Sequence, residues 1–290
     1  MKDKIKISVV IPVYNEEKYI VRCLESIENN TVAPYEIIVA DGHSEDKTRA
    51  LAKKFSGVRV LDNPGRTAAC GRNVGIKAAG GNIIAFTDGD CYTDKNWIGS
   101  IERAFLENDV DGIGGKVVAS EAENEYEAFW NKLAWSILMS FGDEQYIVRD
   151  RTMNDAFITA NCAYKKTLLK KLRGFDLWFG NNAEDIDLSW RALASGAKLM
   201  YCPEPIIYAH GVTSLKDIKQ KSFRNGISSS KLQKRYGGRI NFDKNIYKMW
   251  AHEFPNLFKS DPMKKLAINE LTWHLLGKYY GSIKYHVFNI

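Results

Sequence analysis

The chain has 290 residues, 45% of them hydrophobic and 26% charged, which is the composition of a globular protein large enough to bury a core. Its formal net charge of +6 suits phosphate-bearing ligands or an anionic membrane surface, but it is too small and too spread out to indicate nucleic-acid binding. Five scattered cysteines without a CxxC pair predict reduced thiols in a cytoplasmic protein, and neither a signal peptide nor a run of about 18 apolar residues is recognisable.

The first 120 residues alternate apolar runs with helical patterns. Ile20, Cys23, Leu24 and Ile27 share one helix face, and Ser44 is expected to cap the next helix. Strands are predicted at 5–13, 35–41, 58–63, 82–88 and 110–119, and helices at 20–27, 66–80 and 93–108 and after Ser44. Strands that alternate with helices through short links predict an α/β fold with a parallel sheet and right-handed crossovers.

The pattern changes after residue 120. An amphipathic, aromatic-rich segment is expected at 121–142, a strand at 156–166, a helix at 183–196 that Gly196 closes, two short extended runs at 198–210 separated by prolines, and basic helices from Ser214 onward. In the last helix Ile268, Leu271, Leu275 and Tyr279 form an apolar stripe. No repeat or low-complexity linker divides the chain.

Three polar positions follow strand ends in the predicted sheet. Tyr14, Asp41 and the Asp88-Gly89-Asp90 sequence each come just past a strand, at the edge where such sheets bind ligands. Two carboxylates there suit Mg²⁺ or Mn²⁺, which in turn would hold a diphosphate. The alternative is that Asp-Gly-Asp only makes a turn.

A second acidic cluster contains Glu184, Asp185 and Asp187 at a predicted helix start. One of them could act as a general base, or all three could be first-turn residues that the helix dipole favours. His210 follows an apolar run, and it is either structural or a further metal ligand beside carboxylates.

Arginines at three positions are candidates for binding phosphate. Arg66 and Arg72 lie in a segment rich in small residues, and Arg224 shares a helix face with Gln220. The alternative for Arg66 and Arg72 is a solvated basic surface. The dinucleotide-binding and Walker A motifs are missing, and no Ser or Cys has the flanking glycines of a nucleophile elbow.

Taken together, the segments "SVVIPVYNEE", "EIIVADGHSEDKT", "GRTAACGRNVGI", "IIAFTDGD", "AEDIDLSWRALASG" and "YCPEPIIYAHG" resemble those of the family 2 glycosyltransferases, in order and in spacing over about residues 5–230. The resemblance implies the α/β fold called GT-A, which is Rossmann-like with a mostly parallel sheet and flanking helices, here followed by a helical C-terminal extension. It also implies a nucleotide-sugar-binding half at 1–120, an acceptor-binding and catalytic half at 121–230, and the extension at 231–290.

The family resemblance also implies roles for single residues. Asp185 would be the catalytic base. Asp90, with Asp88 and His210, would hold the metal, while Arg66, Glu184 and Arg224 would lie near the diphosphate or the acceptor. The nucleotide-sugar-binding positions would be Pro12, Val13, Tyr14, Glu16, Asp41, Arg72, Asp88, Gly89 and Asp90.

The expected reaction is inverting, metal-dependent transfer of one sugar from a nucleotide-diphospho-sugar to a hydroxyl of a glycan or a lipid-linked acceptor. Only "QKSFRNG" echoes the Q-x-x-R-W motif of processive members, which favours single transfer. A sugar nucleotidyltransferase and a non-catalytic sugar-nucleotide or glycan-binding protein remain alternatives. Residues 126–141 and the C-terminal helices either contact the inner face of a membrane or pack in the core. The sugar, nucleobase, acceptor, linkage and oligomeric state stay open.

Overall fold

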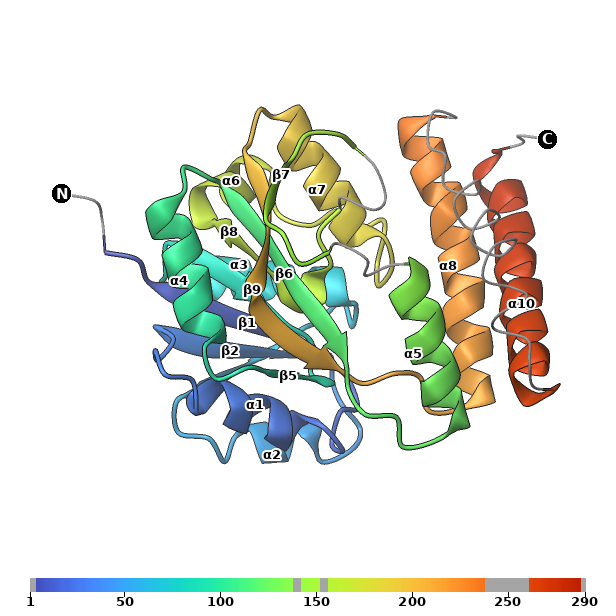
Figure 1. Cartoon of the computed structure of the whole chain (residues 1–290), viewed down its shortest axis with the longest axis horizontal. Helices are drawn as coiled ribbons and strands as arrows, with labels where there is room; N and C mark the ends of the chain where they lie inside the picture. The colour runs from blue at the N-terminus through green and yellow to red at the C-terminus, as the bar shows by residue number, and fades with distance from the viewer. Residues whose placement is uncertain (1–3, 138–141, 152–155, 238–260, 288–290) are drawn as a thin grey trace. The chain divides into compact units, whose positions relative to one another are not determined.

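The computed structural model describes residues 4–137, 142–151, 156–237 and 261–287 (Figure 1). These residues form two compact units. The first unit contains 4–118, 142–151 and 156–209, and the second contains 119–137, 210–237 and 261–287. The units are defined by packing, so the functional halves expected from the sequence stay a prediction. None of the helices in the described ranges is both long enough and apolar enough to cross a membrane.

The first unit is built on one sheet of nine strands, ordered β3-β2-β1-β4-β8-β6-β9-β5, with β7 paired to β9. β1 pairs in parallel with β2 and β4, and β2 pairs in parallel with β3, whereas β8, β5 and β7 join antiparallel. The strands are β1 Ile7–Val13, β2 Glu36–Asp41, β3 Val58–Asp62, β4 Ile83–Phe86, β5 Cys91–Thr93, β6 Gly112–Ala119, β7 Tyr146–Val148, β8 Cys162–Lys165 and β9 Leu199–Ala209.

Helices flank this sheet and confirm the predicted α/β class (Figure 1). They are α1 Ile20–Glu28, α2 Thr48–Ala52, α3 Ala68–Ala78, α4 Trp97–Glu107, α6 Lys166–Lys171 and α7 Glu184–Ala194, with a 3₁₀ turn at Thr159–Asn161. α1 buries the four apolar residues that the sequence placed on one face. Gly196 follows α7 with φ of +82°, as the predicted helix end requires.

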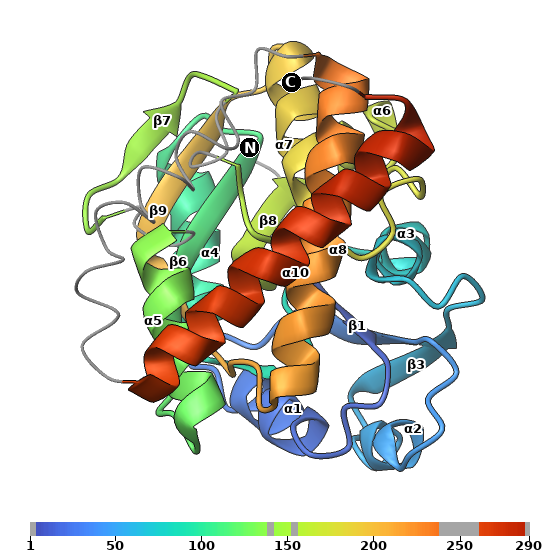
Figure 2. The same ribbon diagram turned by 90° about the vertical axis from the view of Figure 1, so that its right-hand side faces the viewer.

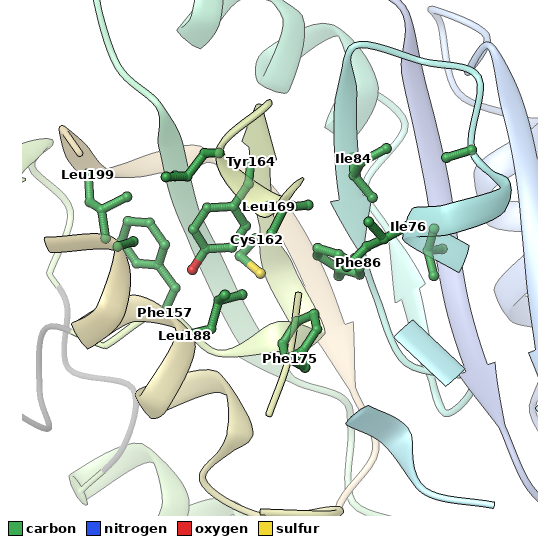
Figure 3. Packing of buried hydrophobic residues seen from close by; sticks show 14 of the residues in the cluster. Ile76, Ile84, Phe86, Phe157, Cys162, Tyr164, Leu169, Phe175, Leu188 and Leu199 are labelled. Carbon is green, nitrogen blue, oxygen red and sulfur yellow. The ribbon is translucent and has the colours of Figure 1, made fainter. Parts of the chain in front are cut away.

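Side chains from the sheet and the helices form the core of the first unit. Figure 3 shows part of this cluster, in which Leu188 of α7 lies beside Tyr164 and Cys162 of β8. α3 approaches β1 closely because Gly75 has no side chain, and a Cβ at that position would overlap Val10. The close approach fixes the position of α3, which carries Arg72.

Two local predictions are wrong. Ser44 does not cap α2, because that helix begins at Thr48, and the Ser44 hydroxyl instead accepts a hydrogen bond from the backbone N–H of Asn15 at 3.0 Å. The two extended runs at 198–210 are one strand, β9. Pro203 and Pro205 lie between the segment paired with β7 and the segment paired with β5, and Asn161 Nδ2 donates to the carbonyls of Pro205 at 2.8 Å and of Lys116 of β6 at 2.7 Å. The short elements β5, β7 and α6 were not predicted.

The second unit consists of helices α5 Glu125–Ile137, α8 Leu215–Tyr236 and α10 Asp261–Tyr285. α8 begins after Ser214, whose hydroxyl accepts the backbone N–H of Asp217 at 3.2 Å. α10 packs along α8 (Figure 2). The apolar core of this unit contains Phe129, Trp130, Leu133, Ile218, Leu266 and Ala267.

Candidate active site

The parallel strands β2, β1 and β4 bring the predicted site residues to one edge of the sheet. Val13 at the end of β1 lies opposite Asp41 at the end of β2, and Val10 lies opposite Phe86 at the end of β4. Tyr14 follows β1 directly, and Asp88 follows β4 after one intervening residue, Thr87. The expectation that these strand ends share an edge is therefore confirmed.

Carboxylates crowd around the turn that follows β4. Burial and the neighbouring carboxylates of Asp90 and Asp88 raise the pKa of Glu16 to about 8. Gly89 makes this proximity possible, because a Cβ at that position would lie 2.9 Å from Val13 Cγ1 and 3.1 Å from Glu16 Cγ. Asp-Gly-Asp thus does more than turn the chain, since it concentrates negative charge.

Two thiols border the same carboxylates, and sequence reasoning missed them. The Cys23 thiol donates to the backbone carbonyl of Asp88 at 3.5 Å, and the Cys91 thiol donates to Asp90 Oδ1 at 3.4 Å. Burial, with the charges of Asp90 and Asp88, raises the pKa of both thiols far above the ordinary value. The thiols therefore stay protonated and act as donors, not as nucleophiles.

Arg72 of α3 connects the turn after β4 with the start of α7. Its guanidinium donates to Asp88 Oδ1 at 2.7 Å and to Glu184 Oε1 at 2.6 Å, and it lies 5.6 Å from the centre of the Phe175 ring. The Arg72 side chain is only 3% exposed. Burial alone would lower the pKa of Arg72, but Asp88 and Glu184 outweigh it and keep the arginine charged.

The first turn of α7 places two carboxylates in different surroundings. Glu184 is buried, and burial together with Asp185 raises the pKa of Glu184 to about 7 although Arg72 opposes the shift. Its Oε2 has no hydrogen-bond partner within the described part of the chain. Asp185 is half-buried and accepts the backbone N–H of Ile186 at 2.8 Å, and burial raises its pKa as well.

The third acidic residue of α7 has a structural role. The buried Asp187 accepts a hydrogen bond from Arg191 Nε at 2.7 Å, and the same guanidinium donates to the backbone carbonyls of Leu172 and Gly174. The acidic cluster at 184–187 therefore divides, because Asp187 holds the preceding loop while Glu184 and Asp185 lie near Arg72.

The loop that leads into α7 is fastened to α3. Asn73 donates through Nδ2 to the carbonyl of Phe175 and accepts its N–H through Oδ1, both at 2.8 Å. Asn181 Oδ1 accepts the backbone N–H of Ala68 at 2.6 Å, which occupies a donor at the start of α3. Ala183 adopts φ of +66° at the junction with α7. The loop is thus held in a strained form next to Glu184.

The ends of β1 and β2 form a second part of this region. Asp41 is buried, accepting the N–H of Ser44 at 3.3 Å and pairing with Arg49 at 3.1 Å. Arg66 donates to the carbonyls of Gly42 and His43 at 3.1 and 3.2 Å, and its guanidinium lies 5.7 Å from the centre of the Tyr14 ring. Tyr14 is 45% exposed, so its ring is accessible to a ligand.

Backbone strain marks this part of the sheet edge. Asn15, His43 and Arg66 all have positive φ, although none is a glycine. Residues held in this conformation cluster at functional sites, where the surrounding structure enforces it.

Two predicted site residues belong to the second unit. His210 Nδ1 lies 3.0 Å from Ser120 Oγ and 3.8 Å from Glu127 Oε1. Arg224 is exposed on α8. The two units are not placed relative to one another, so the grouping of His210 with Asp88 and Asp90 stays a prediction. Among the described residues, no three His, Cys, Asp or Glu side chains gather as a metal site.

Comparison with solved structures shows the fold as GT-A. The chain aligns with the mannosyltransferase PcManGT from Pyrobaculum calidifontis, solved in complex with GDP-Man and Mn²⁺, with a TM-score of 0.61 and 15% identity, over 99% of this chain and 88% of that one. The sequence model of the family described as "Glycosyl transferase family 2" matches residues 8–173, which are more than half of the chain. The protein belongs to this family, as the sequence predicted.

Curated relatives agree with this assignment. Glycosyltransferase AglE of Haloferax volcanii is 32% identical over 137 residues, which are 43% of this chain and 45% of that protein. Dolichyl N-acetyl-alpha-D-glucosaminyl phosphate 3-beta-D-2,3-diacetamido-2,3-dideoxy-beta-D-glucuronosyltransferase of Methanococcus voltae is 26% identical over 236 residues, 76% of this chain and 71% of that protein. The chain thus spans less than half the length of the first of these relatives.

Proposed function

We propose that the protein is an inverting glycosyltransferase that moves one sugar from a nucleotide-diphospho-sugar to an acceptor hydroxyl. The observation that carries the proposal is the bridge made by Arg72. It joins Asp88, at the strand edge where donors bind in such folds, to Glu184, the neighbour of the proposed base Asp185. A donor-binding carboxylate and a proton acceptor are thereby kept within one small region of the first unit.

The nucleotide would lie at the ends of β1 and β2. The exposed ring of Tyr14 offers a stacking surface for a base, and the guanidinium of Arg66 lies beside that ring. Pro12 and Val13 are buried beneath this position and would form the floor of the nucleotide site. Asp41 would accept a further hydrogen bond from the base, beside the bonds that Arg49 and the backbone N–H of Ser44 already make to its two oxygens.

The carboxylates after β4 fit a divalent cation. Mg²⁺ and similar ions in such enzymes are bound through one or two carboxylates, with waters and substrate phosphates completing the shell. Asp88 and Asp90 supply these carboxylates, and their negative charges add to burial in raising the pKa of Glu16. Mn²⁺ or Mg²⁺ bound there would neutralise charge that grows on the departing diphosphate. The Mn²⁺ complex of PcManGT supports this choice, and His210 is proposed as a further ligand.

Asp185 is proposed as the general base. It is half-buried, so it can reach an acceptor hydroxyl, and its raised pKa makes it a stronger proton acceptor than an ordinary aspartate. The bond from Ile186 N–H orients its carboxylate. The acceptor oxygen, losing its proton to Asp185, would attack the anomeric carbon opposite the diphosphate. A single displacement inverts the configuration and needs no nucleophile from the protein.

The acceptor is proposed to be a glycan or a lipid-linked sugar. The name of the Methanococcus voltae relative describes a dolichyl-linked sugar phosphate as acceptor, which supports the lipid-linked class. A lipid-linked acceptor implies work at a membrane, and the proposed location is the cytoplasmic face. Arg66, Glu184 and Arg224 stay proposals for contacts with diphosphate or acceptor.

The proposal is tested with the Asp185→Asn variant. We expect transfer from a nucleotide sugar in the presence of Mn²⁺ to fall by about 10²–10⁴-fold, because the variant cannot take up the proton. Binding of the nucleoside diphosphate, measured by calorimetry, should be retained. Asp187→Asn is the matched control on the same helix turn, with its effect confined to stability. Full turnover in Asp185→Asn would exclude Asp185 as the base, and release of pyrophosphate would instead indicate a nucleotidyltransferase.

A further inference from the structure

α10 packs with its apolar side outward. The face that contacts α8 contains Gly277 and Gly281, with the buried polar residues Glu270 and His274. The opposite side, here called the outward α10 face, carries six large apolar residues that are between 40% and 70% exposed: Ile268, Leu275, Leu276, Tyr279, Tyr280 and Ile283. Most of the apolar stripe read from the sequence therefore does not pack in the described core.

The inversion has a steric cause. A Cβ at Gly277 would overlap the backbone carbonyl of Phe223, and a Cβ at Gly226 would overlap the carbonyl of His274. The two helices therefore approach at backbone distance, which large side chains would prevent. Small residues bring the two backbones together, so most of the large apolar residues of α10 are left outside the closest contact.

Charge on the two helices is strongly one-sided. α8 carries seven Lys or Arg residues and a single acid, Asp217. α10 carries Lys264, Lys265, Lys278 and Lys284 against two acids, Asp261 and the buried Glu270. A surface that combines exposed apolar and aromatic side chains with lysines has the composition of interfacial membrane helices.

A groove beside this face also combines apolar and aromatic side chains with lysines. It has a volume of about 450 Å³ and is lined by Leu215, Lys216, Lys219, Gln220, Phe223 and Trp273. The groove is continuous with the outward α10 face, because the Phe223 ring lies 6.2 Å from that of Trp273 and 5.9 Å from that of Tyr280. Lys216 and Lys219 would suit a lipid phosphate above apolar walls.

We propose that the outward α10 face and this groove dock on the surface of an anionic lipid bilayer. The occupant is assigned by charge, because a second copy of the chain would bring an equally cationic surface against this one. Anionic headgroups complement the lysines, and the acyl region accepts the leucine, isoleucine and tyrosine side chains. The proposal goes beyond sugar transfer and does not depend on it.

The test is flotation of the purified full chain with vesicles. We expect binding to vesicles of phosphatidylcholine with 30% phosphatidylglycerol, on the order of a cell's anionic content, and weak binding to phosphatidylcholine alone. Added salt should weaken binding, because it screens the lysines. The double variant Tyr279→Ser, Ile283→Ser should reduce partitioning by about tenfold or more, because two inserted apolar side chains are lost.

Leu106→Ser is the matched control, because Leu106 is an exposed apolar residue on α4 of the first unit. It should bind vesicles like the unchanged protein. Circular dichroism and thermal melting should show all variants folded, since the substituted side chains are exposed. Equal binding to both vesicle types, or binding unaffected by the double variant, would overturn the proposal. A dimer in light scattering that the double variant dissociates would also overturn it, by showing that a second copy covers the face.

Discussion

Replacing Arg72 by methionine removes the cation that joins Asp88 to Glu184. Two charge-assisted hydrogen bonds of 2.7 and 2.6 Å are lost from a side chain that is 3% exposed. Removing one partner of a buried ion pair costs about 3–5 kcal/mol, because the other charge is left buried without compensation. Glu184 is that charge. Asp88 is about one-third exposed, so water can compensate it in part.

The cost should depend on pH in a definite direction. The pKa of Glu184 is already about 7, and Arg72 is what holds it from rising further. In Arg72→Met the Glu184 carboxyl should therefore be protonated at pH 6. Keeping it buried in that neutral form costs the protein little stability. Near pH 8 the Glu184 carboxyl must either ionise without a cationic partner or stay protonated at a pH where an exposed carboxyl would be ionised, and both cost free energy. We expect a loss near the upper end of the range at pH 8 and a smaller loss at pH 6.

Urea unfolding followed by circular dichroism at both pH values measures this difference. Arg59→Met is the matched control, since Arg59 also bonds a carboxylate, Glu36 at 2.6 Å, but is 52% exposed. Its removal should cost at most about 1 kcal/mol at either pH. If Arg72→Met destabilises no more than the control, or its cost does not grow with pH, the Arg72 bridge does not have the energetic role assigned to it.

Two further predictions concern stability. Gly277→Ala should lower the free energy of unfolding by about 1–3 kcal/mol, because the added methyl meets the Phe223 carbonyl; a thermal melt unchanged by this substitution would argue against backbone contact of α8 and α10. The pKa values of Glu184 and Glu270 are both raised from 4.5 to about 7 on folding, chiefly by burial. The folded chain then binds more protons than the unfolded chain between these pH values, so stability should be greatest below about pH 4.5 for these groups and fall as pH rises through 7. Melting temperatures of the metal-free protein at pH 5.5 and 8 check this sign, and a higher value at pH 8 would contradict it.

Sequence periodicity predicted the first half of the fold because its strands are buried on both faces. The apolar runs at β1, β2 and β4 had no competing interpretation, and their parallel order placed Tyr14 and Asp88 at one edge. Elements of three residues, such as β5 and β7, carry too few side chains for a period to show. The prolines of β9 suggested a break, because the groups that border them, such as Asn161 at the Pro205 carbonyl, are apparent only in three dimensions.

The candidate site was found in outline, but its connections were not. Nothing in the sequence pairs Arg72 with Glu184, since 112 positions separate them. The division between Asp187 and its two acidic neighbours depends on Arg191, which the sequence shows only as another charged residue of a helix. The inverted packing of α10 was also hidden, because hydrophobicity alone favours burying Leu275 and Tyr279 over Gly277.

The three-way contact of Arg72 has an evolutionary consequence. A change at any one of Arg72, Asp88 and Glu184 leaves the other two mismatched, so the positions should be inherited as a set. A relative with a neutral residue at the place of Arg72 is expected to have a neutral residue at the place of Glu184 as well. Drift at these three places should therefore occur by paired replacement.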